Sequence, residues 1–133
     1  SRDIGRAVSV QLAKEGAKVV INYFDNEDNA QETLKLVNEA GGEGIIVKAD
    51  MTKANEVADL VAKTTSAFGQ EIHILVNVAG GLVARKTTLE MDEDFWDFVM
   101  NVNLKSVFLA VRNVLPFMPA GSSIINFSSL AGR

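Results

Sequence analysis

Apolar and polar positions follow two patterns along this chain. Four short runs are rich in β-branched residues and do not alternate apolar with polar, which is typical of strands buried on both faces of a parallel sheet. Between them, apolar residues recur every three or four positions, as expected of helices that bury one face. The predicted strands are 18–23, 44–48, 72–78 and 123–127, and the predicted helices are 4–15, 26–40, 52–68 and 92–115.

This alternation of strand and helix predicts an α/β fold with a doubly wound parallel sheet and right-handed crossovers. Gly16, the pair Gly41–Gly42 and Gly69 stand where predicted helices stop, and Thr52 stands where an N-cap belongs. We find no linker, repeat or low-complexity segment. Residues 1–133 are therefore predicted to form a single domain or part of one.

The predicted helix Asp92–Leu115 is apolar nearly all round. Phe95, Val99 and Val102 lie on one face, and Trp96, Met100, Leu104, Val107, Val111 and Val114 cover much of the rest. A helix that lies on a sheet needs only one apolar stripe. Two interpretations stay open: a core helix of a larger domain, or a helix whose second face packs on a partner subunit.

Composition excludes several classes of protein. The net charge is −4, and the few aromatic residues are not interleaved with basic ones, which disfavours nucleic acid and anionic membranes as partners. The sequence has no run of about eighteen apolar residues and opens with no signal peptide. With no cysteine and no clustered ligands around the lone His73, we expect no metal site. We expect a cytoplasmic protein.

Several polar residues stand at predicted strand ends, where open α/β sheets bind ligands. The opening Ser1-Arg2-Asp3-Ile4-Gly5 leads into a helix, and its N–H groups either face a phosphate or simply form a tight turn. Asp50 follows the second strand and either accepts hydrogen bonds from an adenine amino group or helps to cap the next helix.

The third and fourth strands add an asparagine and a serine. Asn77-Val78-Ala79-Gly80 ends the third strand with small residues that let a flat ligand approach. Asn103 lies mid-helix among apolar residues and needs partners if buried. The run Ser123–Phe127 delivers Ser128 and Ser129 to the same edge of the sheet.

Together these motifs resemble the short-chain dehydrogenase/reductase family along the whole chain. The opening is similar to the end of the Thr-Gly-x-x-x-Gly-x-Gly fingerprint, with Gly5 as its last glycine. Asp50 matches the adenine-contacting aspartate, and Asn77 to Gly80 match the Asn-Asn-Ala-Gly motif. Asn103 and Ser129 match the asparagine and serine of the catalytic tetrad.

The sequence departs from the family motifs at two residues, and two further elements of the family pattern are not found in residues 1–133. Asp3 replaces the middle glycine of the fingerprint, and Val78 replaces the second asparagine. The resemblance implies a first strand before Ser1 and a Tyr-x-x-x-Lys pair after Arg133. That first strand would lie between the 18–23 and 72–78 strands, so the Rossmann-like sheet is expected to be incomplete in this chain.

The resemblance implies transfer of hydride between a nicotinamide cofactor and a carbonyl or alcohol carbon. Ser129 would donate a hydrogen bond to the substrate oxygen, and Asn103 would position a water that links the family lysine to solvent. The implied cofactor-binding residues are Ser1, Arg2, Asp3, Ile4, Tyr23, Phe24, Asp50, Met51, Asn77, Val78, Ala79 and Gly80.

We expect NADP(H) rather than NAD(H). Arg2 is suited to the 2′-phosphate of the ribose, and no acidic residue stands at Asn22 or Tyr23, where NAD-preferring members tend to carry aspartate. Against this, Phe24 fills a position that is often basic in NADP enzymes, and Asp25 is placed to hold a free 2′-hydroxyl.

The substrate and assembly are expectations from the same resemblance. The runs 16–23 and 101–106 are similar to those of 3-oxoacyl-(acyl-carrier-protein) reductases, and sugar-alcohol and steroid dehydrogenases share them. A homo-oligomer, a dimer or tetramer, is expected through Asp92–Leu115. The alternative is a catalytically inactive nucleotide-binding or scaffold protein of the same fold, since fold does not fix function.

Overall fold

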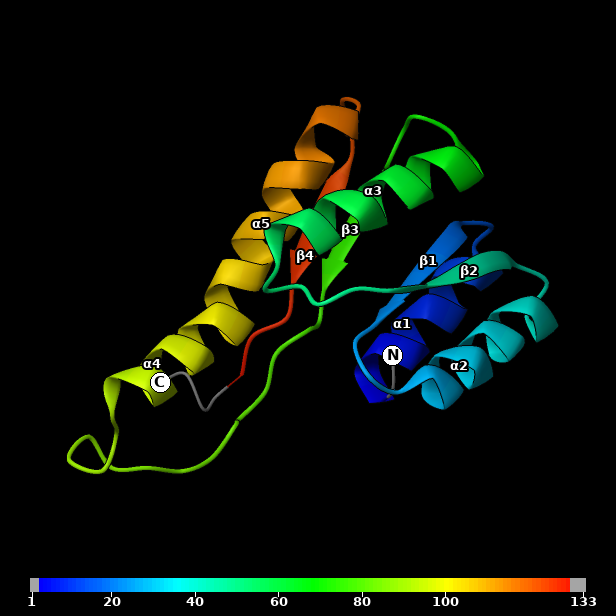
Figure 1. Cartoon of the computed structure of the whole chain (residues 1–133). Coiled ribbons are helices and arrows are strands. Elements are labelled where there is room, and N and C mark those ends of the chain that lie inside the picture. Colours follow the sequence, from blue (N-terminus) through cyan, green and yellow to red (C-terminus); the bar gives the residue numbers. More distant parts are fainter. Residues whose placement is uncertain (1–2, 130–133) are drawn as a thin grey trace. The chain divides into compact units, whose positions relative to one another are not determined.

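In a computed structural model, residues 3–129 are described and form four strands alternating with helices (Figure 1). The residues divide into two compact units. Among the described residues, unit 1 comprises 3–50 and 58–70, and unit 2 comprises 51–57 and 71–129. The elements in chain order are α1 (Asp3–Lys14), β1 (Lys18–Tyr23), α2 (Glu27–Glu39), β2 (Glu43–Lys48), α3 (Ala54–Phe68), β3 (Ile74–Asn77), α4 (Glu93–Met100), the π-helix η1 (Asn101–Lys105), α5 (Ser106–Val114), the 3₁₀ turn η2 (Leu115–Phe117) and β4 (Ser123–Asn126).

Unit 1 is built on the parallel pair β1–β2, which runs from Lys18 opposite Glu43 to Tyr23 opposite Lys48. Helices α1 and α2 pack on this pair and on each other (Figure 1). Its core consists of small and β-branched side chains from α1, β1 and α2: Ala13, Val19, Ile21, Ala30 and Val37. Burial of these residues stabilises the strand pair because apolar surface is removed from water.

Two glycines set the spacing in unit 1. Gly41 has a φ of +84°, a left-handed conformation that ends α2 as the sequence predicted. A Cβ at the next residue, Gly42, would lie 2.5 Å from Cβ of Ala13, so α1 can approach the start of β2 only where no side chain is present.

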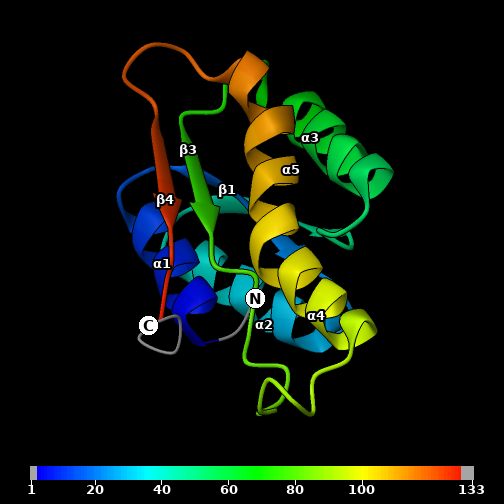
Figure 2. The same ribbon diagram turned by 90° about the vertical axis from the view of Figure 1, so that its left-hand side faces the viewer.

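Unit 2 is built on the parallel pair β3–β4, with Ile74 opposite Ser123 and Asn77 opposite Asn126. Figure 2 shows the two strands side by side with α5 next to β3. Among the described residues the chain therefore has two separate two-stranded sheets, and β1 is not paired with β3. This agrees with the expected incomplete sheet, and the predicted α/β class with parallel strands is confirmed.

The long apolar helix is continuous from Glu93 to Phe117 but changes type along its length. Asp92 caps it by accepting a hydrogen bond from the backbone N–H of Phe95 at 2.8 Å. The α-helical geometry is interrupted by the π-helical segment Asn101–Lys105, and Pro116 lies in the closing 3₁₀ turn. By length and composition alone, with a mean hydropathy of 1.2, this stretch is the one helix among the described residues that is suited to crossing a membrane.

The predicted helix 52–68 starts two residues too early. The observed α3 begins at Ala54, because residues 51–52 form a turn after β2. The capping role of Thr52 stays a prediction. The predicted single domain over residues 1–133 stays a prediction, since each compact unit is described by itself.

Candidate functional site

The carboxyl ends of β3 and β4 meet at one edge of the unit 2 sheet (Figure 2). Asn77 is the last residue of β3, and its carbonyl accepts a hydrogen bond from the backbone N–H of Phe127 at 2.9 Å. This bond extends the ladder one residue past β4 and directs the chain toward Ser129, which is exposed. Parallel pairing thus brings two predicted motifs, Asn77–Gly80 and Ser129, to the same edge.

The asparagine inside the apolar strand β3 has a partner in β4. The side-chain amide of Asn77 donates to Oδ1 of Asn126 at 2.8 Å, between residues that are also directly opposite in register. This bond ties the two strand ends together beside the exposed edge. Asn126 is a residue that our sequence analysis missed; the signal was a second asparagine ending an apolar run.

Asn103 is hydrogen-bonded to the loop that follows β3. Its Oδ1 accepts from the N–H of Gly81 at 2.9 Å, and its Nδ2 donates to the carbonyl of Gly81 at 3.2 Å. Nδ2 also donates to the carbonyl of Val99 at 3.0 Å, one turn earlier on the helix. Asn103 is exposed, and its amide nevertheless has the partners that the sequence analysis required only of a buried side chain.

The backbone around this contact requires glycine at position 80. Gly80 has a φ of +149°, and a Cβ there would lie 2.7 Å from Oδ1 of Asn103. Asn103 itself lies in the π-helical segment, a local widening that often occurs at functional positions in helices. Helix and loop are therefore shaped around the same asparagine.

The remaining unit 2 prediction, Met51, is half-buried in the turn that follows β2. Val78 and Ala79 lie between Asn77 and Gly80 in the same irregular segment. Unit 2 thus contains Met51, Asn77, Val78, Ala79, Gly80, Asn103 and Ser129 of the predicted site.

In unit 1, helix α1 begins at Asp3, where the family fingerprint has a glycine. Asp3 has a φ of +50°, a left-handed conformation that glycine adopts without cost and that aspartate tolerates better than most residues. Ile4 follows it and is exposed. The first N–H groups of a helix lack acceptors within the helix, so they are available to an anion. Ser1 and Arg2 lie outside the described residues.

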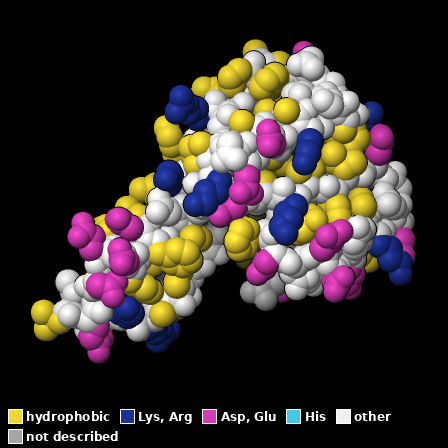
Figure 3. Space-filling view, viewed as in Figure 1, with side chains coloured by type: hydrophobic (Ala, Val, Ile, Leu, Met, Phe, Trp, Pro, Cys, Tyr) yellow, Lys and Arg dark blue, Asp and Glu magenta, His cyan; other side chains and the backbone are white. Residues whose placement is uncertain are grey.

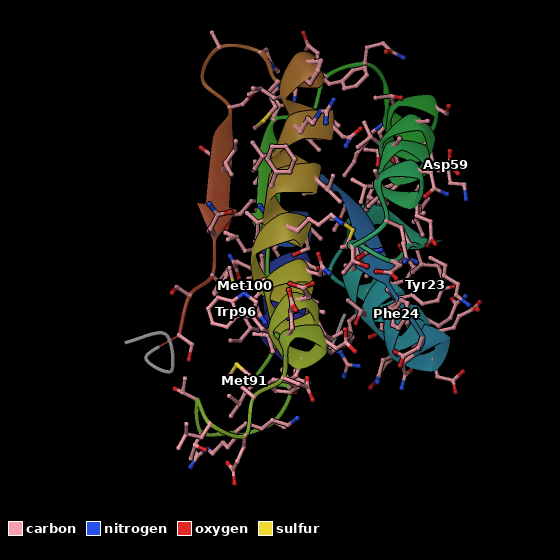
Figure 4. All side chains as sticks on the ribbon, turned by 60° about the vertical axis from the view of Figure 1, so that its left-hand side comes forward. Tyr23, Phe24, Asp59, Met91, Trp96 and Met100 are labelled. Atoms are coloured by element: carbon pink, nitrogen blue, oxygen red, sulfur yellow. The ribbon has the colours of Figure 1, made fainter. Side chains whose placement is uncertain are left out.

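The end of β1 presents two aromatic side chains, shown with Asp59 in Figure 4. Partial desolvation, followed by a hydrogen bond to Glu27 and the charge of that carboxylate, raises the pKa of the Tyr23 phenol. Phe24 is largely exposed. No carboxylate of β1 itself is present at this strand end, which agrees with the sequence.

Asn22 closes the end of the β1–β2 ladder. Its Nδ2 lies 3.2 Å from the carbonyl of Val47, 3.1 Å from that of Ala49 and 3.3 Å from that of Tyr23. Asp50 comes directly after Ala49, just past the end of β2, and is half-buried. The unit 1 part of the predicted site is therefore Asp3, Ile4, Tyr23, Phe24 and Asp50, and the structure describes it separately from the part in unit 2.

No group of three or more His, Asp or Glu side chains suited to a metal ion exists within residues 3–129. His73 is exposed, and its Nε2 lies 3.5 Å from Oε2 of Glu71. It stands just before β3 rather than inside a strand, because β3 begins at Ile74. The absence of a metal from the mechanism stays a prediction.

Comparison with known proteins places these motifs in context. A family model described as enoyl-(acyl carrier protein) reductase matches residues 1–133. A 3-oxoacyl-(acyl-carrier-protein) reductase of Staphylococcus epidermidis is 35% identical over 99% of this chain and 54% of its own length. A 3β-hydroxysteroid dehydrogenase of Mediterraneibacter gnavus is 38% identical over 97% of this chain and 46% of its own.

Solved structures agree. A short-chain dehydrogenase/reductase of Serratia marcescens superposes with a TM-score of 0.91 at 36% identity, covering 97% of this chain and 52% of that one. An NADH-dependent reductase of alginate metabolism gives a TM-score of 0.92 at 33% identity, covering 100% of this chain and 56% of its own. The chain thus spans about half the length of the curated relatives it matches.

Proposed function

This chain belongs to the short-chain dehydrogenase/reductase family, and from that premise we propose that the whole protein is a nicotinamide-dependent oxidoreductase that reduces a carbonyl group or oxidises the matching alcohol. The observation that carries the proposal is the edge of unit 2. There Asn103 holds the loop after β3 through two hydrogen bonds, and the segment after β4 brings Ser129 to the same edge.

Ser129 is proposed to act on the substrate oxygen. Its hydroxyl is a donor, and a hydrogen bond aimed at the carbonyl oxygen stabilises the negative charge that develops there. The family tyrosine, acting as general acid or base with its lysine, is not represented in these residues: the one tyrosine, Tyr23, has Glu27 four positions later. We assign that proton transfer to the whole protein.

Asn103 is proposed to be a positioning residue. Both hydrogens of its amide are engaged by the carbonyls of Gly81 and Val99, and Oδ1 accepts one N–H. A water held by this side chain would therefore use the second lone pair of Oδ1. The same bonds fix the backbone of Gly81, so the loop does not have to be ordered when substrate binds.

The residues present fit a nicotinamide dinucleotide. The first N–H groups of α1 suit a pyrophosphate, and the small residues Ala79 and Gly80 let a flat ring approach the backbone. Asp50 supplies carboxylate acceptors at the end of β2. When bound, the nicotinamide donates or accepts the hydride. One residue fits poorly: Asp3, the first residue of α1, adds a negative charge at the helix end where an anion would be held.

For the cofactor we propose NADP(H) over NAD(H). The proposal is supported by the absence of a carboxylate on β1 and by the amide of Asn22, which is engaged by backbone carbonyls. Glu27 beside Tyr23 favours the opposite choice, and one structural neighbour is an NADH-dependent reductase. The ratio of kcat/KM for NADPH and NADH decides between them.

The experiment that tests the proposed function measures oxidation of NADPH and NADH by the whole protein with a 3-oxoacyl thioester as substrate. We expect Ser129→Ala to lower kcat by about 10²- to 10³-fold and to leave the dissociation constant of the cofactor nearly unchanged. Ser128→Ala is the matched control and should retain most of the activity. Equal loss in both variants, or nucleotide binding without turnover in the parent, would favour the catalytically inactive alternative.

Oligomer formation is a second part of the proposal. The helical stretch Glu93–Phe117 exposes large apolar side chains, with Trp96 at 55% and Phe108 at 57% of their surface. Trp96 and Met100 project from the same side of it (Figure 4). We propose that this surface packs on a second subunit, and Trp96→Asp should shift the mass measured by light scattering toward the monomer. The cytoplasm stays the predicted compartment.

A further inference from the structure

The loop after β3 and the helix α4 line an open pocket of about 460 Å³ in unit 2. We propose that this pocket binds the distal part of the carbonyl substrate, and that this part is an apolar chain ending in a carboxylate held by Arg85. The inference rests on the proposed function and adds the chemical class of the substrate. The volume of the pocket is in the range of small-molecule sites.

The walls of the pocket are mostly apolar. Met91, Phe95 and Val99 are half-buried and come from the stretch before α4 and from α4 itself. Leu82 and Val83 face them from the loop and are exposed at 64% and 42% of their surface. Such a lining favours a hydrocarbon chain, because filling the pocket removes the apolar surface of these exposed side chains from water.

One cation at this pocket is available to a ligand. Nζ of Lys86 lies 4.4 Å from the centre of the Phe95 ring and 3.8 Å from Oδ2 of Asp92, so it is engaged within the protein. Arg85 also lines the pocket, is exposed, and has no ion-pair or hydrogen-bond partner within residues 3–129. A guanidinium in this position matches a planar carboxylate, which it can bind through two hydrogen bonds.

Nearby acidic groups do not neutralise Arg85. Oε2 of Glu90 accepts hydrogen bonds from the N–H of Thr87 at 2.9 Å and from its hydroxyl at 2.8 Å. Asp92 caps α4 and is close to Lys86. Figure 3 shows Asp and Glu side chains as well as Lys and Arg side chains next to apolar ones around this loop and α4.

The pocket adjoins the loop residue that the positioning asparagine holds. Gly81, which lines it, is the residue that Asn103 binds through both its N–H and its carbonyl. Arg85 is four residues further on, a span of at most about 14 Å of extended chain. A substrate whose carbonyl and carboxylate are separated by roughly five to eight carbon atoms fits within that upper limit.

The test begins with binding and uses two probes that differ only in charge, octanoate and octanamide, titrated calorimetrically into the whole protein. We expect octanoate to bind about fivefold more tightly, the range of an exposed charge pair. Arg85→Gln should abolish this difference. Arg112→Gln, which removes another exposed arginine of the same unit outside the pocket, should preserve it.

Turnover gives the second arm, with 7-oxooctanoate and 7-oxooctanamide as substrates. We expect the ratio of their kcat/KM values to favour the acid and to fall toward one in Arg85→Gln. Equal affinity for octanoate and octanamide in the parent, or the same change in Arg112→Gln, would overturn the proposed pocket. Normal octanoate binding with reduction of neither ketone would instead count against the proposed function and leave the binding site in place.

Discussion

The two strand pairs of this chain have similar apolar sequences, but their side chains are buried to very different extents. In β1, Val19 and Ile21 are 7% and 3% exposed, beneath α1 and α2. In β4, Ile124 and Ile125 are 37% and 45% exposed, although they belong to an equally β-branched run. Unit 1 therefore closes a core with its own helices, whereas unit 2 leaves apolar strand surface open.

This difference coincides with the part of the chain in which we propose the chemistry. The proposed catalytic serine and its positioning asparagine are both in the less covered unit, at the edge of β3–β4. Because the chain spans about half the length of its relatives, we expect the open surface of unit 2 to be covered in the whole protein. Unit 1 has the closed core, and unit 2 carries the edge at which we propose the reaction takes place.

The largest effect should come from the same truncation made in both units. Ile21→Ala should lower the free energy of unfolding of the 133-residue chain by about 3 kcal/mol, because it leaves a cavity in a closed core. Ile125→Ala should cost less than about 1 kcal/mol, since its side chain is already half in water. Urea denaturation followed by circular dichroism measures both, and equal losses would contradict the comparison.

A smaller effect should follow from loosening the loop after β3. Asn103→Ala removes both hydrogen bonds to Gly81, and we expect the amide of Gly81 to exchange about tenfold faster with solvent. Asn101→Ala, in the same π-helical segment, is the control. Unchanged exchange at Gly81 in the Asn103 variant would remove this asparagine from the ordering of the loop.

In unit 1, one arginine links α1 to α2. Nη2 of Arg6 lies 2.8 Å from Oε2 of Glu32, and Nε of Arg6 donates a hydrogen bond to Oγ1 of the fully buried Thr33 at 3.1 Å. We expect Arg6→Gln to lower the free energy of unfolding by about 1 kcal/mol. The exposed pair Lys35–Glu39, at 3.7 Å, is the matched case, and Lys35→Gln should cost less than about 0.5 kcal/mol. A larger loss in Lys35→Gln would refute this ranking.

The smallest effect concerns pH. Hydrogen bonds from the backbone N–H and then the hydroxyl of Thr87 hold the pKa of Glu90 below its ordinary value. Because the pKa of Glu90 is lowered in the folded loop, the ionised carboxylate stabilises the loop, and this stabilisation is complete when the pH is above the ordinary pKa. The stabilisation is lost as the pH falls through the lowered pKa. Thr87→Val should move the pKa of Glu90 part of the way back, as measured by an NMR titration. An ordinary pKa in the parent would contradict the contact.

Most of the fold follows from the sequence. The apolar run 18–23 is β1 as predicted, and Gly16, Gly41 and Gly69 have the positive φ values expected at helix ends. These features are local, and periodicity and glycine chemistry report them directly. The start of α3 was predicted two residues too early because it depends on the turn after β2, which has no periodic signal.

The site was predicted as a set of residues and not as a set of contacts. The sequence indicated Asn77 and Asn103, but their partners, Asn126 and Gly81, are 49 and 22 positions away. Pairs so distant in the chain come together only through sheet register and helix placement. The pocket at Arg85 was missed for the same reason: one exposed arginine in a loop has no distinctive pattern until its neighbours are known to be paired.

Amide hydrogen exchange of the 133-residue chain tests the difference between the two units most directly. The account predicts that Ile21 and Val47, in the ladder of β1–β2, exchange at least about tenfold more slowly than Leu75 and Ile125, in the ladder of β3–β4, because protection follows the free energy of local opening. Equal protection of the two ladders, or slower exchange in β3–β4, would contradict the account.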